Sequence, residues 1–302
     1  MELRPREADR GDLVHLIRLT YPGAESHKVL LDHVTQEWNW LWNTGRFLVV
    51  AVDDALTGKT VALMGAILIR EAFFQRLCQA VHPFVSRRLG RAPEPGDDPL
   101  ARDGETVDGT CSLLMNYFAW DASSGDPEEA AILRGYLANT FLDIHGGYAI
   151  RRIVVEVVGK ETQLLTMRTG SVVLNEYREW CEENDVAESD RPFLLAIDRE
   201  EALLSENHWF TRAFRYRPPL LGLGLGQRQM LHWACQGLTD KQIAEKLSIG
   251  QDALKKRWEA TYDRYYECLP GMLPLSDGGR RGGEKRRVVV THIRTRQEEI
   301  RP

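Results

Sequence analysis

The sequence predicts two domains of different class: an α/β domain on a mixed sheet in residues 1–200, and an all-α domain in residues 221–275. The chain has 302 residues, more than a single hydrophobic core usually supports. Residues 1–200 alternate apolar β-branched runs with amphipathic segments, as in a sheet covered by helices. Residues 221–275 instead contain successive segments with apolar residues at helical spacing. We expect a linker at 201–220 and a basic tail at 276–302.

The composition is that of an ordinary globular protein, with 43% hydrophobic and 27% charged residues. No apolar run approaches the length of about 18 residues that a membrane span needs. The start of the chain lacks the apolar stretch of a secretion signal, so we expect a cytoplasmic protein without membrane contact.

The five cysteines are scattered and form no CxxC pair. They are Cys78, Cys111, Cys181, Cys235 and Cys268. Their apolar surroundings favour buried, reduced thiols over a redox or metal role. The sequence therefore predicts no metal site and no cofactor.

The two parts of the chain differ in charge. Residues 221–302 carry 15 Lys+Arg and 10 Asp+Glu, a net charge of +5, whereas residues 1–220 carry 24 and 34, a net charge of -10. An acidic body joined to a basic end suits a protein that contacts nucleic acid with one end only. The basic excess is modest, so chance clustering is an alternative.

The strands and helices of the first domain follow from its apolar periodicity. Strands are expected near Leu3 and at 46–52, 61–69, 111–120, 153–158, 172–177 and 193–197. Helices are expected at 12–20, 28–42, 73–89 and 127–144, and the Pro-, Gly- and Asp-rich stretch 91–109 is expected to be a loop.

This order of elements over residues 1–200 resembles the GNAT acetyltransferase fold. Residues 153–158, 161–170 and 171–177 correspond to its fifth strand, fourth helix and sixth strand. The resemblance implies an acetyl-CoA site, in which a turn and the N-terminus of the next helix hold the pyrophosphate. Free N–H groups and the helix dipole favour an anion at such a position.

The residues at that position do not match the family. Asp126 is expected to be the N-cap, with Pro127 at the first helical position and Glu129 as the acidic member of a capping box. Together with Glu128, these carboxylates would repel a pyrophosphate. Thr166 stands where the family often has a tyrosine acid, and threonine cannot protonate a thiolate. We therefore expect a degenerate sensing or dimerisation domain without catalytic residues, and the alternative is an N-acetyltransferase fused to a helix-turn-helix.

The second domain has the pattern of a helix-turn-helix. Residues 226–237 form a first helix that stops at a glycine, and Thr239 caps a second helix over 240–247. After a tight turn a third helix begins at Gln251, and it would lie in a DNA major groove.

This segment resembles the LuxR-type (GerE-like) family over about 50 residues. The similarity lies in Gly237, in Ile243 and Ala244, and in a lysine, Lys255. The chain departs from the family at the entry 223–227, where the usual Arg-Glu pair is missing. Further departures are Gly250 for a serine cap and Arg257 for a histidine.

The resemblance implies DNA-contacting residues on the second and third helices. These are Lys241, Gln251, Asp252, Lys255, Lys256 and Arg257. Auxiliary phosphate contacts are expected from the tail, at Arg280, Arg281, Lys285, Arg286 and Arg287. Alternatively, the tail packs against the helix-turn-helix, and the basic run of the third helix is only a solvated face.

The favoured hypothesis is a sequence-specific transcription regulator that binds double-stranded DNA as a homodimer. Contact with RNA polymerase is a further possibility, with or without base recognition. The first domain would sense a small-molecule ligand, for which Trp38, Trp40 and Trp42 offer an aromatic pocket. Ordinary helix packing is the alternative explanation for these tryptophans.

Overall fold

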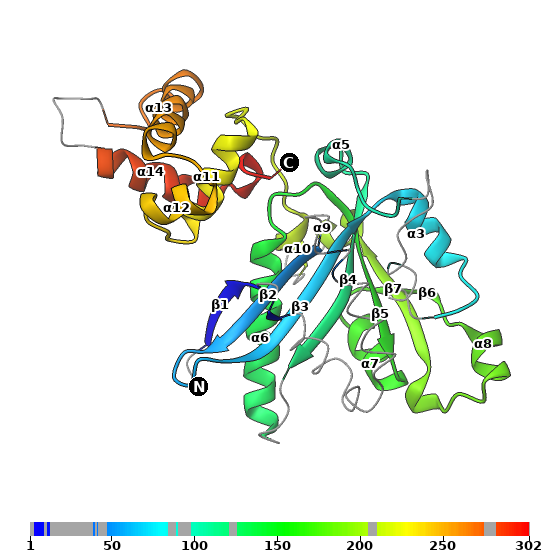
Figure 1. The fold of residues 1–302 in the computed structure, drawn as a ribbon. Helices are drawn as coiled ribbons and strands as arrows, with labels where there is room; N and C mark the ends of the chain where they lie inside the picture. Colours follow the sequence, from blue (N-terminus) through cyan, green and yellow to red (C-terminus); the bar gives the residue numbers. More distant parts are fainter. Residues whose placement is uncertain are drawn as a thin grey trace. The chain divides into compact units, whose positions relative to one another are not determined.

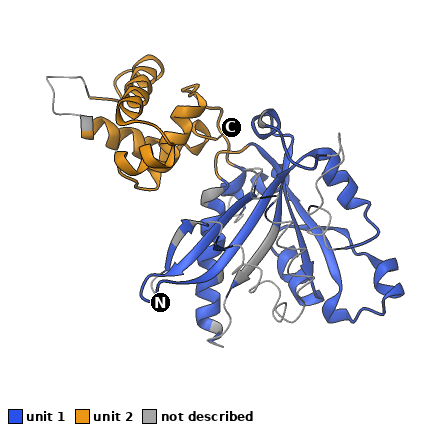
Figure 2. Cartoon of the chain, in the orientation of Figure 1, with its two compact units in different colours: residues 1–145, 149–214 blue, residues 146–148, 215–302 orange. Residues whose placement is uncertain are grey.

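The computed structural model describes residues 3–8, 11–12, 39, 41, 47–83, 89, 98–120, 126–204, 210–274 and 282–301. The chain divides into two compact units (Figure 2). The first contains Met1–His145 and Ala149–Phe214, and the second Gly146–Tyr148 and Arg215–Pro302. The tryptophans Trp38, Trp40 and Trp42 and the helix expected at 12–20 lie outside the described residues, apart from Asp12.

The first unit is built on a mixed sheet with seven described strands (Figure 1). Their order is β1-β2-β3-β4-β5-β7-β6. The strands are β1 (Leu3–Glu7), β2 (Phe47–Asp54), β3 (Lys59–Ile69), β4 (Cys111–Trp120), β5 (Ile150–Val158), β6 (Val172–Asn175) and β7 (Pro192–Asp198). Within the described sheet only β4 and β5 are parallel neighbours. This topology confirms the predicted α/β class and its GNAT-like order.

Helices lie between and after the strands. In the first unit they are α3 (Glu71–Cys78), α5 (Asp103–Val107), α6 (Pro127–Ile144), α7 (Lys160–Met167), α8 (Arg178–Glu183), α9 (Arg199–Leu204) and α10 (Thr211–Phe214), with a 3-10 turn η2 (Glu188–Asp190). Most of α9 and all of α10 fall where the sequence suggested a linker at 201–220. The helix expected at 73–89 spans Glu71–Cys78, and Pro83, which lacks an amide donor and disfavours helical backbone at the residue before it, prevents its continuation toward residue 89.

The two faces of the sheet carry different helices. On one face, Phe73, Phe74 and Leu77 of α3 pack on apolar side chains of β3, β4, β5 and β7. The connections β4–α6–β5 and β5–α7–β6 cross the sheet in the same direction. Because such connections are right-handed, α6 and α7 lie together on the opposite face.

The second unit is helical, as predicted. Its helices are α11 (Leu225–Cys235), α12 (Asp240–Lys246), α13 (Gln251–Cys268) and α14 (Gly282–Thr295), followed by a 3-10 turn η3 (Gln297–Glu299). Thr239 caps α12 by accepting a hydrogen bond from the Gln242 amide. The helices share a core that includes Leu231, Ile243, Trp258 and Ile293, so α14 is part of this packed unit.

Candidate functional site

The strands β4 and β5 separate halfway along their length. Their parallel ladder ends at the pair Met115–Val155. Beyond that pair, β4 continues to Trp120 on β3, and β5 continues to Val158 on β7. In the described register their second halves do not pair with each other, and Figure 1 shows the two strands diverging.

A β-bulge in β4 explains this separation. Met115 pairs with Ala66 and Tyr117 with Gly65, so Asn116 is an extra residue in β4. A bulge bends its strand and increases the local twist, which turns the second half of β4 away from β5. Main-chain N–H and C=O groups then face the gap from both sides. Such groups require partners, and an extended ligand that carries amides can supply them.

The helix that follows β4 begins with negative charge. Asp126 is the N-cap of α6 and accepts a hydrogen bond of 2.9 Å from the Glu128 amide, with Pro127 in the first turn. The first turn also holds the carboxylates of Glu128 and Glu129. The preceding turn, 121–125, lies outside the described residues. The described part of this helix end is therefore poorly suited to bind a pyrophosphate.

The helix that follows β5 is α7, and it contributes a buried hydrogen-bond acceptor rather than negative charge. Gly159 caps α7 with φ of +86°, and a Cβ there would lie 2.7 Å from the Ser189 carbonyl oxygen, so glycine is required. One turn later, Gln163 is buried, and its Oε1 atom accepts no hydrogen bond from the described residues. The Thr166 hydroxyl donates to the Thr162 carbonyl within α7. Gln163 is thus a buried acceptor close to the end of β5.

A carboxylate lies at the point where the strands separate. Glu156 is half-buried and follows Val155, the last residue of β5 that pairs with β4. Side chains alternate along a strand, so Glu156 is on the same face as Val154 and Arg152, which contact α3 or its core. Sequence analysis missed Glu156, although a lone acidic residue within the apolar run 153–158 was a usable signal.

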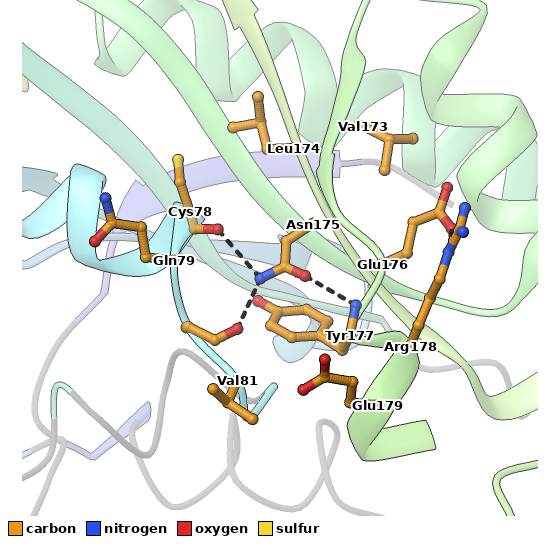
Figure 3. Close-up of a pocket in the computed structure, with 11 residues that line it drawn as sticks. Cys78, Gln79, Val81, Val173, Leu174, Asn175, Glu176, Tyr177, Arg178 and Glu179 are labelled. Atoms are coloured by element: carbon orange, nitrogen blue, oxygen red, sulfur yellow. Dashed lines mark hydrogen bonds and ion pairs between the residues drawn. The ribbon is translucent and has the colours of Figure 1, made fainter. Parts of the chain in front are cut away.

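A cavity of about 530 Å³ lies between α3, β6 and α8 (Figure 3). Its walls come from residues 78–81 and 173–179. Asn175 joins the two sides: its amide nitrogen donates to the Cys78 and Ala80 carbonyls, and its oxygen accepts from the Tyr177 amide. Burial raises the pKa of the Cys78 thiol, which makes this cysteine a poor nucleophile.

The other end of α3 is fixed by an ion cluster around the buried Arg152. Arg152 of β5 donates to Glu71 at 2.9 and 3.0 Å and to Asp198 at 2.9 Å, and its guanidinium lies over the Phe74 ring. Burial opposes the charge of Arg152, but these bonds outweigh it and raise its pKa. The helix that forms one wall of the cavity is therefore held at both ends.

In the second unit, α12 and α13 are joined by a short turn in which Ser248 has φ of 52°. Buried Ile243, Ala244 and Leu254 hold the two helices together. The expected helical character of this unit is thus confirmed, whereas the more specific LuxR-type helix-turn-helix assignment is not.

The residues predicted to contact DNA differ in their surroundings. Exposed side chains are those of Lys241, Gln251, Asp252, Lys255 and Lys256. Arg257, by contrast, is half-buried and donates to the Gly226 carbonyl at 3.3 Å. The sequence pattern therefore placed one packing residue among the surface residues.

Two of the basic side chains of the tail have partners within the second unit. Arg286 pairs with Asp240 at 2.8 Å, donates to the Leu238 carbonyl and lies over the Trp258 ring. The Lys285 ammonium lies over two tyrosine rings, and Arg287 is exposed. Arg280 and Arg281 lie outside the described residues. The contacts of Lys285 and Arg286 thus agree with the alternative that the tail packs against the other helices of this unit.

The described residues lack two further kinds of feature. They contain no cluster of three or more His, Cys, Asp or Glu side chains able to hold a metal ion. None of the helices among them combines the length and apolar character that crossing a membrane requires.

No family model matches the chain, and no curated protein matches its sequence. Similar solved structures cover about two thirds of the chain. A spermidine/spermine N-acetyltransferase from Vibrio cholerae covers 68% of this chain and 98% of its own, with 13% identity and a TM-score of 0.38. An N-acyl amino acid synthase from uncultured soil microbes covers 67% and 95%, with 11% identity and a TM-score of 0.37. A putative GNAT acetyltransferase from Desulfovibrio desulfuricans covers 65% and 98%, with 10% identity and a TM-score of 0.35.

These findings contradict the hypothesis of a DNA-binding transcription regulator, and with it the expected DNA and RNA polymerase partners. The similar structures are acyl-transferring enzymes, and one is a spermidine N-acetyltransferase in complex with CoA and spermine. The physical reason for the error is that the helix-turn-helix pattern records packing positions. Ile243, Ala244 and Trp258 build a helical core whatever the exposed surface binds.

Proposed function

We propose that the first unit is an N-acyltransferase, which transfers an acyl group from a coenzyme A thioester to an amine. The gap between β4 and β5 carries this proposal. An opened parallel pair offers main-chain donors and acceptors on both sides, next to a carboxylate, Glu156. A thioester held there would lie between an N–H that stabilises negative charge on its oxygen and a group that accepts a proton.

The pantetheine arm of coenzyme A fits the described residues. It is extended and contains amides, so it can bind between the strands as a further strand would. The Oε1 atom of Gln163 is a buried acceptor one turn after β5, and an amide N–H of the arm would satisfy it. An amide N–H of the arm would therefore supply the hydrogen-bond donor that Gln163 lacks among the described residues.

The nucleotide end of coenzyme A fits less well. Asp126, Glu128 and Glu129 put negative charge at the described start of α6, where a pyrophosphate would be repelled. We therefore expect most of the binding free energy to come from the arm and the acyl group. Acetyl-pantetheine should bind nearly as tightly as acetyl-CoA.

Calorimetry on the full chain tests the proposal. Wild-type protein should bind acetyl-CoA and acetyl-pantetheine with similar dissociation constants. Gln163→Leu should weaken both about ten-fold, the cost of one lost hydrogen bond at a buried acceptor. Gln251→Leu, at an exposed position of α13, is the matched control and should change neither. Folded wild-type protein that binds neither thioester would overturn the proposal.

The expected cytoplasmic location of the protein stays a prediction.

A further inference from the structure

The second unit includes a short segment that is far from the rest of the unit in sequence. Gly146–Tyr148 belongs to the second unit, whereas the residues before and after it belong to the first (Figure 2). In the chain these three residues connect α6 to β5. The chain therefore passes between the units at two places: around Gly146–Tyr148, and again between Phe214 and Arg215.

The first of these places is in contact with η3 and the residue that follows it. Arg301 donates to the Gly146 carbonyl at 3.4 Å, and its guanidinium lies 5.1 Å from the centre of the Tyr148 ring. Gly147 packs on the backbone of η3, because a Cβ on Gly147 would lie 2.5 Å from the Glu298 nitrogen. Gly147 also has φ of +89°, so the conformation and the close approach both require glycine.

The second place is held by residues on either side of the same turn. The buried Glu299 carboxylate accepts hydrogen bonds from the Leu220 and Leu221 amides, both at 2.9 Å. Arg296 donates to the Pro218 carbonyl at 2.9 Å. One short stretch around η3 thus holds the chain near both places where it passes between the units.

This stretch is attached to the helices of its unit less firmly than they are to each other. The Glu299 and Ile300 amides bond within the stretch, to the Arg296 and Gln297 carbonyls. The Arg301 carbonyl accepts from Arg228 of α11 at 2.8 Å. Among the described residues, Ile300 supplies the apolar contact of the stretch with the core, and it is only partly buried. A 3-10 turn with few buried apolar contacts opens more readily than packed helices do.

We propose that residues 296–301 form a strap that opens and closes as one element. Closed, the strap fixes both the connection between α6 and β5 and the segment 218–220. Open, it frees both together, while α11 to α14 stay packed. The second unit thereby controls how much freedom the end of α6 and the start of β5 have. This inference does not rest on the acyltransferase function proposed above.

A strap that opens as one element couples its two sides, and such coupling is reciprocal. Loosening the contact with Gly146–Tyr148 should expose the Leu220 amide. Loosening the contact with Leu220 should expose the Ala149 amide, which donates to the Thr106 carbonyl at 2.8 Å directly after the segment. Two independent local contacts predict neither effect.

Hydrogen–deuterium exchange of the full chain, followed at the Leu220 amide by peptide mass spectrometry, tests the first direction. Gly147→Ala adds a methyl group for which the backbone of η3 leaves no room, and it should speed this exchange about ten-fold, at the lower end of the cost of overpacking. Gly271→Ala is the matched control. Gly271 has φ of +86°, but a Cβ there meets nothing within 4 Å, so its variant has similar backbone strain and should leave Leu220 unchanged.

A second variant opens the same contact without backbone strain. Arg301→Ala removes the hydrogen bond to Gly146 and the contact with the Tyr148 ring, and it should speed exchange at the Leu220 amide about five-fold. Arg294→Ala is its control, because Arg294 also donates to a main-chain carbonyl, that of Cys235 at 2.7 Å, but from α14. It should leave Leu220 unchanged.

Glu299→Gln tests the reverse direction. It weakens the acceptor of the Leu220 amide and should speed exchange at the Ala149 amide about five-fold. Glu245→Gln, at an exposed position of α12, is the control and should leave Ala149 unchanged.

The amides of α13 show whether the whole unit has opened. Faster exchange at Leu220 in Gly147→Ala and Arg301→Ala, with α13 unchanged, would support the strap. Wild-type exchange at Leu220 in both variants would overturn it. An equal rise throughout α13 would also overturn it, because the stretch would then open only together with the helices. The experiment uses no acyl donor, so its outcome is separate from that of the thioester-binding test.

Discussion

The polar groups near the gap in the first unit and those of the second unit with its basic tail differ in whether they have partners within the fold. In the gap, main-chain groups of β4 and β5 face each other without a shared ladder, and in α7, one turn beyond the end of β5, the Gln163 side-chain carbonyl is buried without a partner among the described residues. In the second unit, Arg286 and Arg257 are bonded to Asp240 and to main-chain carbonyls. Polar groups left for a ligand mark a binding site, whereas polar groups satisfied within the fold mark packing.

This difference explains why basic residues were a poor guide to function here. A lysine or arginine in a sequence has the same charge whether it meets a phosphate or a tyrosine ring. Only the partners in the folded chain separate the two roles. The stability of the second unit should therefore depend on its internal polar contacts, whereas the polar groups at the gap of the first unit should affect ligand binding.

The largest expected effect is on the stability of the second unit. The buried Glu299 carboxylate accepts hydrogen bonds from the Leu220 and Leu221 amides and lies near Arg296. Glu299→Ala leaves these donors unsatisfied and should lower the free energy of unfolding by about 3 kcal/mol. Urea unfolding followed by tryptophan fluorescence measures it. Glu245→Ala, at an exposed position of α12, is the control and should cost less than about 0.5 kcal/mol.

Much of the fold could be predicted from local sequence patterns. The strand 111–120 and the helix 127–144 match β4 and α6, because a short apolar run, Asp126 and Pro127 are local signals. The candidate site could not be found in this way. The gap depends on a bulge in β4 that shifts the register of β4 on β3. The cavity brings residues 78–81 next to 173–179. Such contacts between distant segments leave no local pattern.

The two neighbouring arginines of α14 should differ in how much they contribute to the free energy of unfolding, and this effect should be smaller than that of Glu299→Ala. Arg286 makes an ion pair, a main-chain hydrogen bond and a cation–π contact, whereas Arg287 is exposed. Arg286→Leu should lower the free energy of unfolding of the second unit by about 1.5 kcal/mol, and Arg287→Leu by less than about 0.5 kcal/mol. Equal losses in urea unfolding would show that the tail is not held by these contacts.

Next in size is the effect of charge at the start of α6. Asn is as good an N-cap as Asp, so Asp126→Asn together with Glu128→Gln and Glu129→Gln removes three charges without removing the cap. Acetyl-CoA should then bind about five-fold more tightly, while acetyl-pantetheine, which has no pyrophosphate, should be unaffected. Calorimetry on both ligands checks this. If both ligands bound more tightly by the same factor, the carboxylates would act on the arm and not on the nucleotide.

The smallest expected effect is a pH dependence in the second unit. Burial lowers the pKa of His292, and its Nδ1 atom lies 2.8 Å from the Tyr265 hydroxyl; Glu299 and Arg296 act on it with opposite sign. Because the folded-state pKa lies below the ordinary value of 6.5, the unfolded chain binds more protons between the two values. The stability that neutral His292 contributes is thus complete above 6.5 and is lost as the pH falls through the lowered pKa.

His292→Gln should reduce this decline in unfolding free energy, while the His232→Gln control on α11 should retain it. Urea titrations between about pH 5 and pH 7 measure the difference. Because His292 is only partly buried, solvent screening keeps the effect smaller than those above. A His292→Gln protein that loses stability on acidification as the wild type does would assign the decline to other groups.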